Sequence, residues 1–599
     1  MRQVVAVLLA GLLSTAVVAA AQGPTPSSSK TKKSSSSAAS VSAQLAEMRQ
    51  AIESQQQAIQ AQQQQMQQLM DQLKSRDGQI QQLQQQVSQA QEKSESATSV
   101  ATQQQAAVTT VQSEVSDLKA NQTSVALSLQ ETQKNLSEPP TAIHFKGVTL
   151  TPGGFLAAEF VRRSRALGAD INTPFNSLTL PGASPSTLSE FFGSGRQSRI
   201  SLLAEGRLTN AKLTGYVEAD FLSAGVTSNN NESNSYTLRQ RQAWGQAAFD
   251  NGWTVTGGQM WSLVTETKHG VDNRSEALPM TIDPQYNVGF SWARQYGIRA
   301  SKNLGNKMWL AVSVENPQTT LATVHNNASN FLLGSAGAAG GLYNSTANYS
   351  FNQSPDVIGK VVFEPGFGHY EVFGIFARFR DRVFPCAEAS ATFPCGGSTT
   401  PTSFGAYNAS KSGGGVGANA RWSFVNKHLD FGLHFLGGSG IGRYGSGGLP
   451  DTTVHADGTL ALLKNYQALG TVEWHGPKLD VYFNGGGEYA SRDWQIDPIS
   501  GKPVGYGSPL FSNTGCFTEP VAGSGGFTPG SLGSTCTGDT RVLIEGTAGF
   551  WYRFYSGPKG RIQWGPQFSY VTRNTWSGLG GSPHGIDGMI FTSFRYYLP

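Results

Sequence analysis

The sequence predicts an all-β transmembrane barrel of 16 antiparallel strands, preceded by a long α-helical, trimeric coiled coil. Three features predict this fold: an export signal, a seven-residue apolar repeat, and a long region in which apolar and polar residues alternate. Only 14% of the 599 residues are charged, 10% are aromatic and 70 are glycine. After the export signal no apolar run is long enough for a membrane-spanning helix, and the many aromatic residues argue against a disordered chain.

Residues 1–21 are predicted to be a signal peptide. Arg2 supplies the positive end, residues 4–13 form the apolar segment, and Ala19 to Ala21 form a small-residue cleavage site. The alternative is an uncleaved anchor helix. Residues 22–40, rich in Ser and Lys, follow as a disordered linker because they contain almost nothing that could be buried.

Residues 41–138 are predicted to form a coiled coil in the periplasm. Apolar residues such as Leu45, Ile52 and Ile59 recur every seven positions, a spacing from which a lone helix would drift away. β-Branched residues occur at both core positions and favour a trimer over a dimer, although several glutamines interrupt the core. A Gln-rich disordered spacer is the alternative.

Residues 139–599 are predicted to form the barrel. Pro139 and Pro140 end the helix, and the apolar period then changes from seven to two, as where Val217 and Ala219 alternate with Glu218. Seven short turns alternate with eight long loops, which makes 16 strands with short turns on one rim and long loops on the other. A soluble β-sandwich, the alternative, would not have this asymmetry.

The predicted barrel has eight long loops and aromatic residues near both of its rims. The predicted long loops are 165–197, 223–235, 262–290, 317–355, 382–412, 439–463, 491–539 and 574–586. The aromatic residues expected at the two membrane–water interfaces include Trp253, Trp309, Trp474, Tyr552 and Tyr555.

Two stretches carry a resemblance to a known family. The stretches SRISLLAEGRLTNAKLTGYVEADF (198–221) and LRQRQAWGQAAF…GGQMWS (238–262), with the signal peptide and the coiled coil, resemble the DcaP-like trimeric porins of Gram-negative outer membranes. The resemblance implies a coiled coil that trimerises in the periplasm, a 16-stranded pore in each subunit, and lumen arginines that favour anionic solutes such as dicarboxylates. This chain departs from the pattern in its unusually long coiled coil and its terminal Pro599.

Charged residues on the polar faces of the strands are the candidates for lining the pore. If Ile200 faces lipid, the alternation turns Arg199 inward. The same alternation gives the pore-lining candidates Arg199, Glu205, Arg207, Glu218, Asp220, Arg239, Arg241, Arg299, Arg541 and Arg561. Arginines opposite carboxylates would create a transverse field that orders dipolar or anionic solutes.

Each of these residues could instead form a structural ion pair or lie at a subunit contact. The strand at 236–249 is the least regular, because Gln240, Gln242 and Gln246 share its expected lipid face. It is therefore a candidate for the trimer interface.

Loop 262–290 is the candidate constriction, since in trimeric porins the third long loop folds inward. Its charged candidates are Glu266, Lys268, Asp272, Arg274, Glu276 and Asp283. The alternative is a solvated external loop.

Four cysteines fit an oxidising compartment. Cys386 and Cys395 lie in one long loop, Cys516 and Cys536 in another, so local pairing is the simplest of three connectivities, with cross-loop pairing as the alternative. Their spacing does not suit zinc, so no metal is expected. No cofactor and no enzyme activity are expected either, because the nine histidines are scattered and no catalytic set is identifiable.

Together these features predict an outer-membrane porin, a passive diffusion channel for small hydrophilic, anionic solutes. The expected partners are two further copies of the chain, outer-membrane lipid, small anionic or polar solutes and peptidoglycan. Nucleic acid is not expected, since the net charge is only +4. The alternative functions are an envelope tether and a trimeric adhesin with a barrel anchor.

Overall fold

The computed structural model describes residues 142–222, 237–317, 319–322, 330–333, 349–387, 395, 400–521 and 535–599. All of them belong to the second of two compact units, Glu131–Pro599. The predicted signal peptide, linker and coiled coil (1–21, 22–40 and 41–138) lie outside the described residues. In the part of the chain that is described, no helix is long and apolar enough to cross a membrane.

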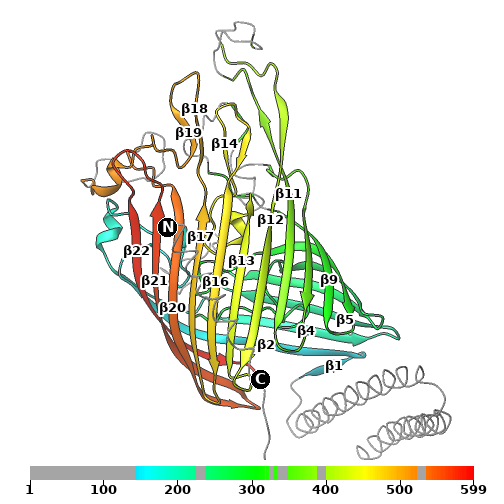
Figure 1. Ribbon diagram of the computed structural model, residues 1–599. Helices are drawn as coiled ribbons and strands as arrows, with labels where there is room; N and C mark the ends of the chain where they lie inside the picture. Colours follow the sequence, from blue (N-terminus) through cyan, green and yellow to red (C-terminus); the bar gives the residue numbers. More distant parts are fainter. Residues whose placement is uncertain are drawn as a thin grey trace, which may run out of the picture. The chain divides into compact units, whose positions relative to one another are not determined.

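The described residues form a closed antiparallel β-barrel of 16 strands (Figure 1), which confirms the predicted fold class. The barrel strands are β2 (Val148–Arg163), β3 (Glu190–Ser194) and β4 (Arg199–Arg207), β5 (Ala211–Asp220), β6 (Arg239–Phe249), β7 (Trp253–Trp261), β8 (Arg294–Leu304), β9 (Met308–Glu315), β10 (Asp356–Phe363), β11 (His369–Val383), β12 (Tyr407–Phe424), β13 (Leu429–Ser439), β16 (Lys464–His475), β17 (Leu479–Ala490), β20 (Thr540–Gly557), β21 (Gly560–Thr575) and β22 (His584–Tyr597). β3 and β4 pair with β2 one after the other and together make one strand position.

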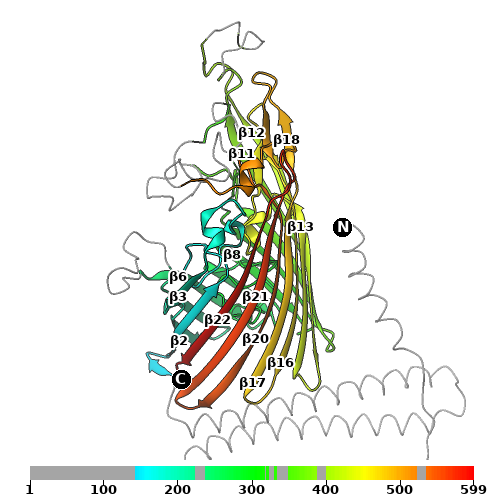
Figure 2. The same ribbon diagram turned by 90° about the vertical axis from the view of Figure 1, so that its left-hand side faces the viewer.

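The first and last barrel strands close the sheet. β2 pairs with β22 from Phe155↔Tyr597 to Arg163↔Met589, and Figure 2 shows β22 between β2 and β21. Closure leaves no row of unpaired backbone groups, which is the condition for a sheet to exist in lipid.

The connections alternate as the sequence predicts. Short turns join β4–β5, β6–β7, β8–β9, β10–β11, β12–β13, β16–β17 and β20–β21. At the β8–β9 turn, Gly305 and Asn306 have φ of 67° and 56°, a conformation that these two residue types tolerate. Several predicted loops differ in detail: loop 165–197 contains β3, β12 begins within loop 382–412, and loops 439–463 and 491–539 each contain a short hairpin.

The remaining short elements are not among the 16 barrel strands, although the first of them pairs antiparallel with the start of β2 and so extends the barrel sheet. They are β1 (Ile143–Phe145), the 3₁₀ turns η2 (Phe175–Ser177), η3 (Ser184–Thr187), η4 (Gly442–Tyr444) and η5 (Thr514–Phe517), and the hairpins β14 (Thr452–Val454)–β15 (Leu460–Leu462) and β18 (Asp493–Ile496)–β19 (Pro503–Tyr506). Figure 1 shows β14, β18 and β19 together at one end of the barrel.

The outward face of the barrel is an exposed apolar surface. Its side chains include Leu156, Phe160, Ile200, Leu202, Val217, Ile298, Val312, Val361, Val372, Phe483, Phe568 and Ile590. A soluble protein rarely exposes so many contiguous apolar side chains, whereas a barrel in lipid requires them. Trp253 and Trp474 are exposed as expected, but Trp309 is buried and packs against His269 of loop 262–290.

Loop 262–290 also contributes to the apolar clusters inside the barrel. Ile282 and Val288 pack with Tyr482 and Phe591 of the wall, and Val264 packs with Trp309 in a second cluster. The loop therefore has its own buried apolar surface within the barrel.

Both disulfides are local, which confirms the simplest predicted pairing. Cys386 is bonded to Cys395 and Cys516 to Cys536. The second disulfide packs against Leu180 from the loop that follows β2, so it holds two of the long loops together.

Candidate functional site

The candidate site is the barrel interior, where loop 262–290 is attached to the wall. Near its start, the Leu263 amide donates to Glu315 Oε1 of β9 at 2.8 Å. The amide and the hydroxyl of Thr267 both donate to Glu371 Oε1 of β11, at 2.9 and 2.6 Å. These contacts exclude the external-loop alternative.

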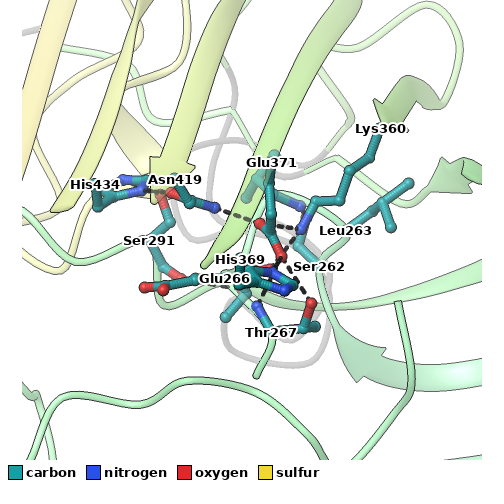
Figure 3. A network of polar contacts seen from close by, with 12 residues as sticks. Ser262, Leu263, Glu266, Thr267, Ser291, Lys360, His369, Glu371, Asn419 and His434 are labelled. Carbon is teal, nitrogen blue, oxygen red and sulfur yellow. Dashed lines mark hydrogen bonds and ion pairs between the residues drawn. The ribbon is translucent and has the colours of Figure 1, made fainter. Parts of the chain in front are cut away.

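Glu371 is the centre of a buried polar network (Figure 3). Lys360 Nζ lies 2.8 Å from its Oε2, and His369 Nε2 lies 2.9 Å from its Oε1. Asn419 Nδ2 also donates to Oε2, at 2.5 Å, while Lys360 donates to the Thr265 carbonyl at 2.7 Å. A buried carboxylate is tolerated only with such compensation, so each of these partners helps to hold the start of the loop.

The second half of the loop is held in the same way by the opposite wall. Four of its backbone amides donate to side-chain oxygens of β16, β21, β20 and β17: Met280 to Glu473 (3.2 Å), Ile282 to Gln567 (2.5 Å), Val288 to Glu545 (2.8 Å) and Gly289 to Glu488 (2.9 Å). Since an irregular loop cannot satisfy its own amides, inward acceptors on the strands take the place of a sheet partner.

Several predicted pore-lining residues come together on β4, β5 and β6. Arg241 Nε lies 2.7 Å from Glu218 Oε1, and its Nη1 lies 2.7 Å from Asp220 Oδ2. Arg239 binds both oxygens of Asp220 at 2.9 Å, and Arg199 Nη1 lies 3.6 Å from Glu218 Oε2. We call these five residues the β4–β6 charge cluster; it contains three cations and two anions.

A β-bulge shapes this cluster. Glu218 pairs with Gln242 but Ala219 pairs with Gln240, so Arg241 is an extra residue in β6. A bulge reverses the facing of the residues that follow it. Three glutamines were expected to share the lipid face, and this expectation is wrong for two of them. Gln242 is buried, and Gln246 accepts a hydrogen bond from Thr256 Oγ1 at 3.1 Å. Gln240 is exposed, as expected.

Other predicted pore-lining residues form local contacts near the short-turn rim. Glu205 pairs with Lys212 and Arg207 with Asp250, each at 2.6 Å, and both pairs are largely solvent-accessible. The Arg561 guanidinium lies 4.0 Å from the centre of the Tyr597 ring. These residues do not join the β4–β6 charge cluster.

Arg299 and Arg541, two further pore-lining candidates, have contacts of their own. Arg299 is buried and donates to Asn273 Oδ1 (2.9 Å) and to the Trp261 carbonyl (2.6 Å), so it holds the loop. Arg541 lies at a second β-bulge, 5.7 Å from the Trp576 ring, which itself packs on Tyr489. The bulge breaks the simple alternation on which the inward orientation of Arg541 was based, so its place in the pore stays a prediction.

The predicted charged residues of the loop divide into buried and exposed sets. Glu266 is buried and pairs with Arg421 of β12 at 2.8 Å. Asp283 is buried and accepts from the Gln285 amide at 2.8 Å, and burial raises the pKa of its carboxyl to about 6. Glu276 Oε1 accepts from the Arg274 amide at 3.2 Å, and Lys268, Asp272 and Arg274 are exposed.

Two cavities adjoin the β4–β6 charge cluster. One of about 320 Å³ is lined by Arg199 and Glu218, by Asp283 and Tyr286 of the loop, and by Arg595 of β22. The other, of about 410 Å³, is lined by Arg239, Arg294 and Arg443 and, among the described residues, by no carboxylate. The first cavity lies between the loop and the wall and is next to arginines, whereas the lining of the second includes the exposed Gln240 and Tyr296 and no residue of loop 262–290.

Sequence reasoning missed most residues that hold the loop, notably Glu315, Lys360, Glu371, Glu488 and Glu545. The only feature that could have identified these residues is their position on the strands, because the side chain of each faces the barrel interior and is buried. It also missed Arg294, which stacks 4.8 Å from the Trp261 ring and forms no ion pair with the described residues.

Solved outer-membrane channels are similar to this chain. The channel DcaP of Acinetobacter baumannii matches with 13% identity over 76% of this chain and 100% of its own, at a TM-score of 0.49. OmpF of Salmonella typhi matches with 10% identity over 76% and 99% (TM-score 0.38), and the anion-selective porin of Comamonas acidovorans with 9% over 75% and 100% (TM-score 0.38).

No protein-family model matches this chain. No curated protein matches its sequence either.

Proposed function

We propose that this protein is an outer-membrane porin of a Gram-negative bacterium, a passive diffusion channel for small hydrophilic solutes. The closed barrel with an apolar outer face supports insertion in a bilayer. The single observation that carries the channel assignment is the inward loop, which narrows the interior yet leaves a cavity of about 320 Å³ lined by charged side chains. A barrel that served only as an anchor would have no need of such a lining.

The favoured solutes are anionic, for example dicarboxylates. The β4–β6 charge cluster has one more cation than anion. The adjoining cavity of about 410 Å³ adds Arg294, which forms no ion pair with the described residues, whereas Arg443 in its lining is paired with Asp356 and Asp451. A surplus of positive charge in a narrow aqueous passage raises the local concentration of anions. Arg199, Arg239, Arg241 and Arg294 are the residues to which we assign this preference.

The active form is a homotrimer with a periplasmic stalk. The heptad repeat of residues 41–138 supports a coiled coil, and its β-branched core residues support three chains. Such a stalk would also bring the chain towards peptidoglycan.

Single-channel recording in planar bilayers tests the proposal. Full-length protein without its signal peptide should conduct in three correlated steps and should show an anion-selective reversal potential in a KCl gradient. A trimer that inserts but does not conduct would overturn the porin assignment, and a conducting, cation-selective trimer would overturn only the assignment of anionic solutes.

A further inference from the structure

Three side chains converge at the end of the barrel where β16 turns into β17. Asp430, Glu473 and His475 each offer one ligand atom, and the three atoms lie within 4.8 Å of one another. His475 Nε2 is 3.5 Å from Asp430 Oδ2 and 3.5 Å from Glu473 Oε2. The strand register explains the meeting, because Asp430 of β13 pairs directly with Glu473 of β16, and His475 follows two residues later on the same face.

The other polar atoms of the two carboxylates are already occupied. Ser423 Oγ donates to Asp430 Oδ1 at 2.6 Å, and the Met280 amide of loop 262–290 donates to Glu473 Oε1 at 3.2 Å. These contacts orient each carboxylate so that its second oxygen is directed at His475. The arrangement therefore presents one oxygen from each carboxylate and one imidazole nitrogen to a common point.

A fourth residue orients the imidazole. Asp480 of β17 pairs with His475 in the strand register, and its Oδ1 lies 3.5 Å from His475 Nδ1. Asp480 is itself held by the guanidinium of Arg553. A carboxylate behind Nδ1 keeps the proton on that nitrogen and leaves Nε2 as a ligand, which is the usual support of a metal-binding histidine.

The local charges favour a dication at this point. Arg553 is paired with Asp480. Arg421 of the neighbouring strand β12 interacts electrostatically with Asp430 and Glu473, but its ion pair is with Glu266. Within the described residues, the only ion-pair partner of Asp430 and Glu473 is His475. A protonated imidazole would neutralise one of these two charges, whereas a divalent cation neutralises both.

We propose that Asp430, Glu473 and His475 bind a divalent transition metal ion of the Zn²⁺ class inside the short-turn end of the barrel. Imidazole nitrogen and carboxylate oxygen are both ligands for Zn²⁺, and three protein ligands leave a position for water. Since the Met280 amide is bonded to Glu473, an ion here is one hydrogen bond away from the inward loop. The site goes beyond the proposed porin function and does not depend on conductance.

Isothermal titration of the full-length trimer in detergent tests the site. The protein is prepared without a polyhistidine tag and stripped with EDTA, and ZnCl₂ is the titrant. One saturable site per chain is expected. His475→Gln should lose at least tenfold in affinity, and Asp480→Asn, which keeps all three ligands, should lose about 10- to 100-fold. His584→Ala, an exposed histidine of β22, is the matched control and should bind as the wild type does.

Co²⁺ added to the wild-type trimer gives a readout that needs no variant. Intense visible absorption from a site of low coordination number would support the proposal, and a spectrum equal to that of aqueous Co²⁺ would overturn it. Equal Zn²⁺ affinity in the wild type and His475→Gln would overturn it as well. Displacement of Zn²⁺ by millimolar Ca²⁺ or Mg²⁺ would overturn the choice of metal class.

Discussion

Arg239 and Arg241 carry the same charge in the same cluster but differ in burial, so their neutral variants separate selectivity from stability. Both guanidiniums bind Asp220 within 3 Å. The side chain of Arg241 is 1% exposed and that of Arg239 is 34% exposed. We therefore expect Arg239→Gln and Arg241→Gln to change anion preference equally and barrel stability unequally.

The size of the expected change in anion preference follows from Coulomb's law. For an ion about 7 Å from the guanidinium in an aqueous passage, one unit of charge is worth about 0.6 kcal/mol, or about threefold in occupancy. Since the effect has opposite sign for Cl⁻ and K⁺, the ratio of their permeabilities should fall by about sevenfold in either variant.

The size of the expected loss in barrel stability follows from how deeply each arginine side chain is buried. Removing Arg241 leaves Glu218 without its 2.7 Å partner in a buried site, which typically costs about 3–5 kcal/mol. Arg239 is partly screened by solvent, so its loss should cost about 1 kcal/mol or less.

Reversal potentials in a KCl gradient and the midpoint of heat denaturation of the trimer are the two assays. Unchanged reversal potentials in both variants would remove the β4–β6 charge cluster from the conducting path. An equal loss of heat stability in both variants would refute the reasoning from burial.

Four further predictions concern the loop, the disulfide and the stalk. Glu371→Ala, which removes the acceptor of Thr267 and the partner of Lys360, should increase single-channel conductance and its noise, because the start of the loop is released. Asp283→Asn should raise the heat-denaturation midpoint at pH 7.5 but not at pH 4. The pKa of the Asp283 carboxyl is about 6 in the folded state, above its unfolded value of 3.8, so the charged carboxyl destabilises the fold only as pH rises from the unfolded to the folded pKa. Replacing Cys516 and Cys536 together by serine should lower the midpoint, since a bridge closing a loop of about 15–20 residues is worth about 3 kcal/mol in the chain-entropy model. Deleting residues 41–138 should weaken trimer formation without closing the pore.

Each of these four predictions has a control and a contradicting outcome. Asp250→Ala, at an exposed carboxylate of the short-turn rim that pairs with Arg207 and not with the loop, should affect conductance less than Glu371→Ala, and equal effects would contradict the role of the buried network. If Asp283→Asn raised the heat-denaturation midpoint equally at both pH values, burial of a charged carboxyl could not be the cause. Reducing the disulfides of the wild-type protein should lower its heat-denaturation midpoint at least as much as the double serine substitution does. A deleted stalk with no measurable conductance would contradict the division between stalk and pore.

The candidate site was predictable only where alternation along a strand is regular. Glu218 and Asp220 lie on β5, which has no extra residue at the β5–β6 bulge, and the sequence places them inward correctly. Gln246 lies beyond the bulge in β6, and alternation fails there because one extra residue exchanges the two faces. The sequence around a bulge carries no pattern that marks the extra residue.

The sequence alone determines the barrel, its 16 strands and the alternation of short and long connections. These features depend on a local property, since each strand has lipid on one side and the interior on the other, and its residues must alternate accordingly. Only the tertiary structure decides where loop 262–290 lies and which charges meet. Glu371, Glu488 and Glu545 are about 100 to 260 residues away from the loop amides that they bind, and barrel closure alone brings them together.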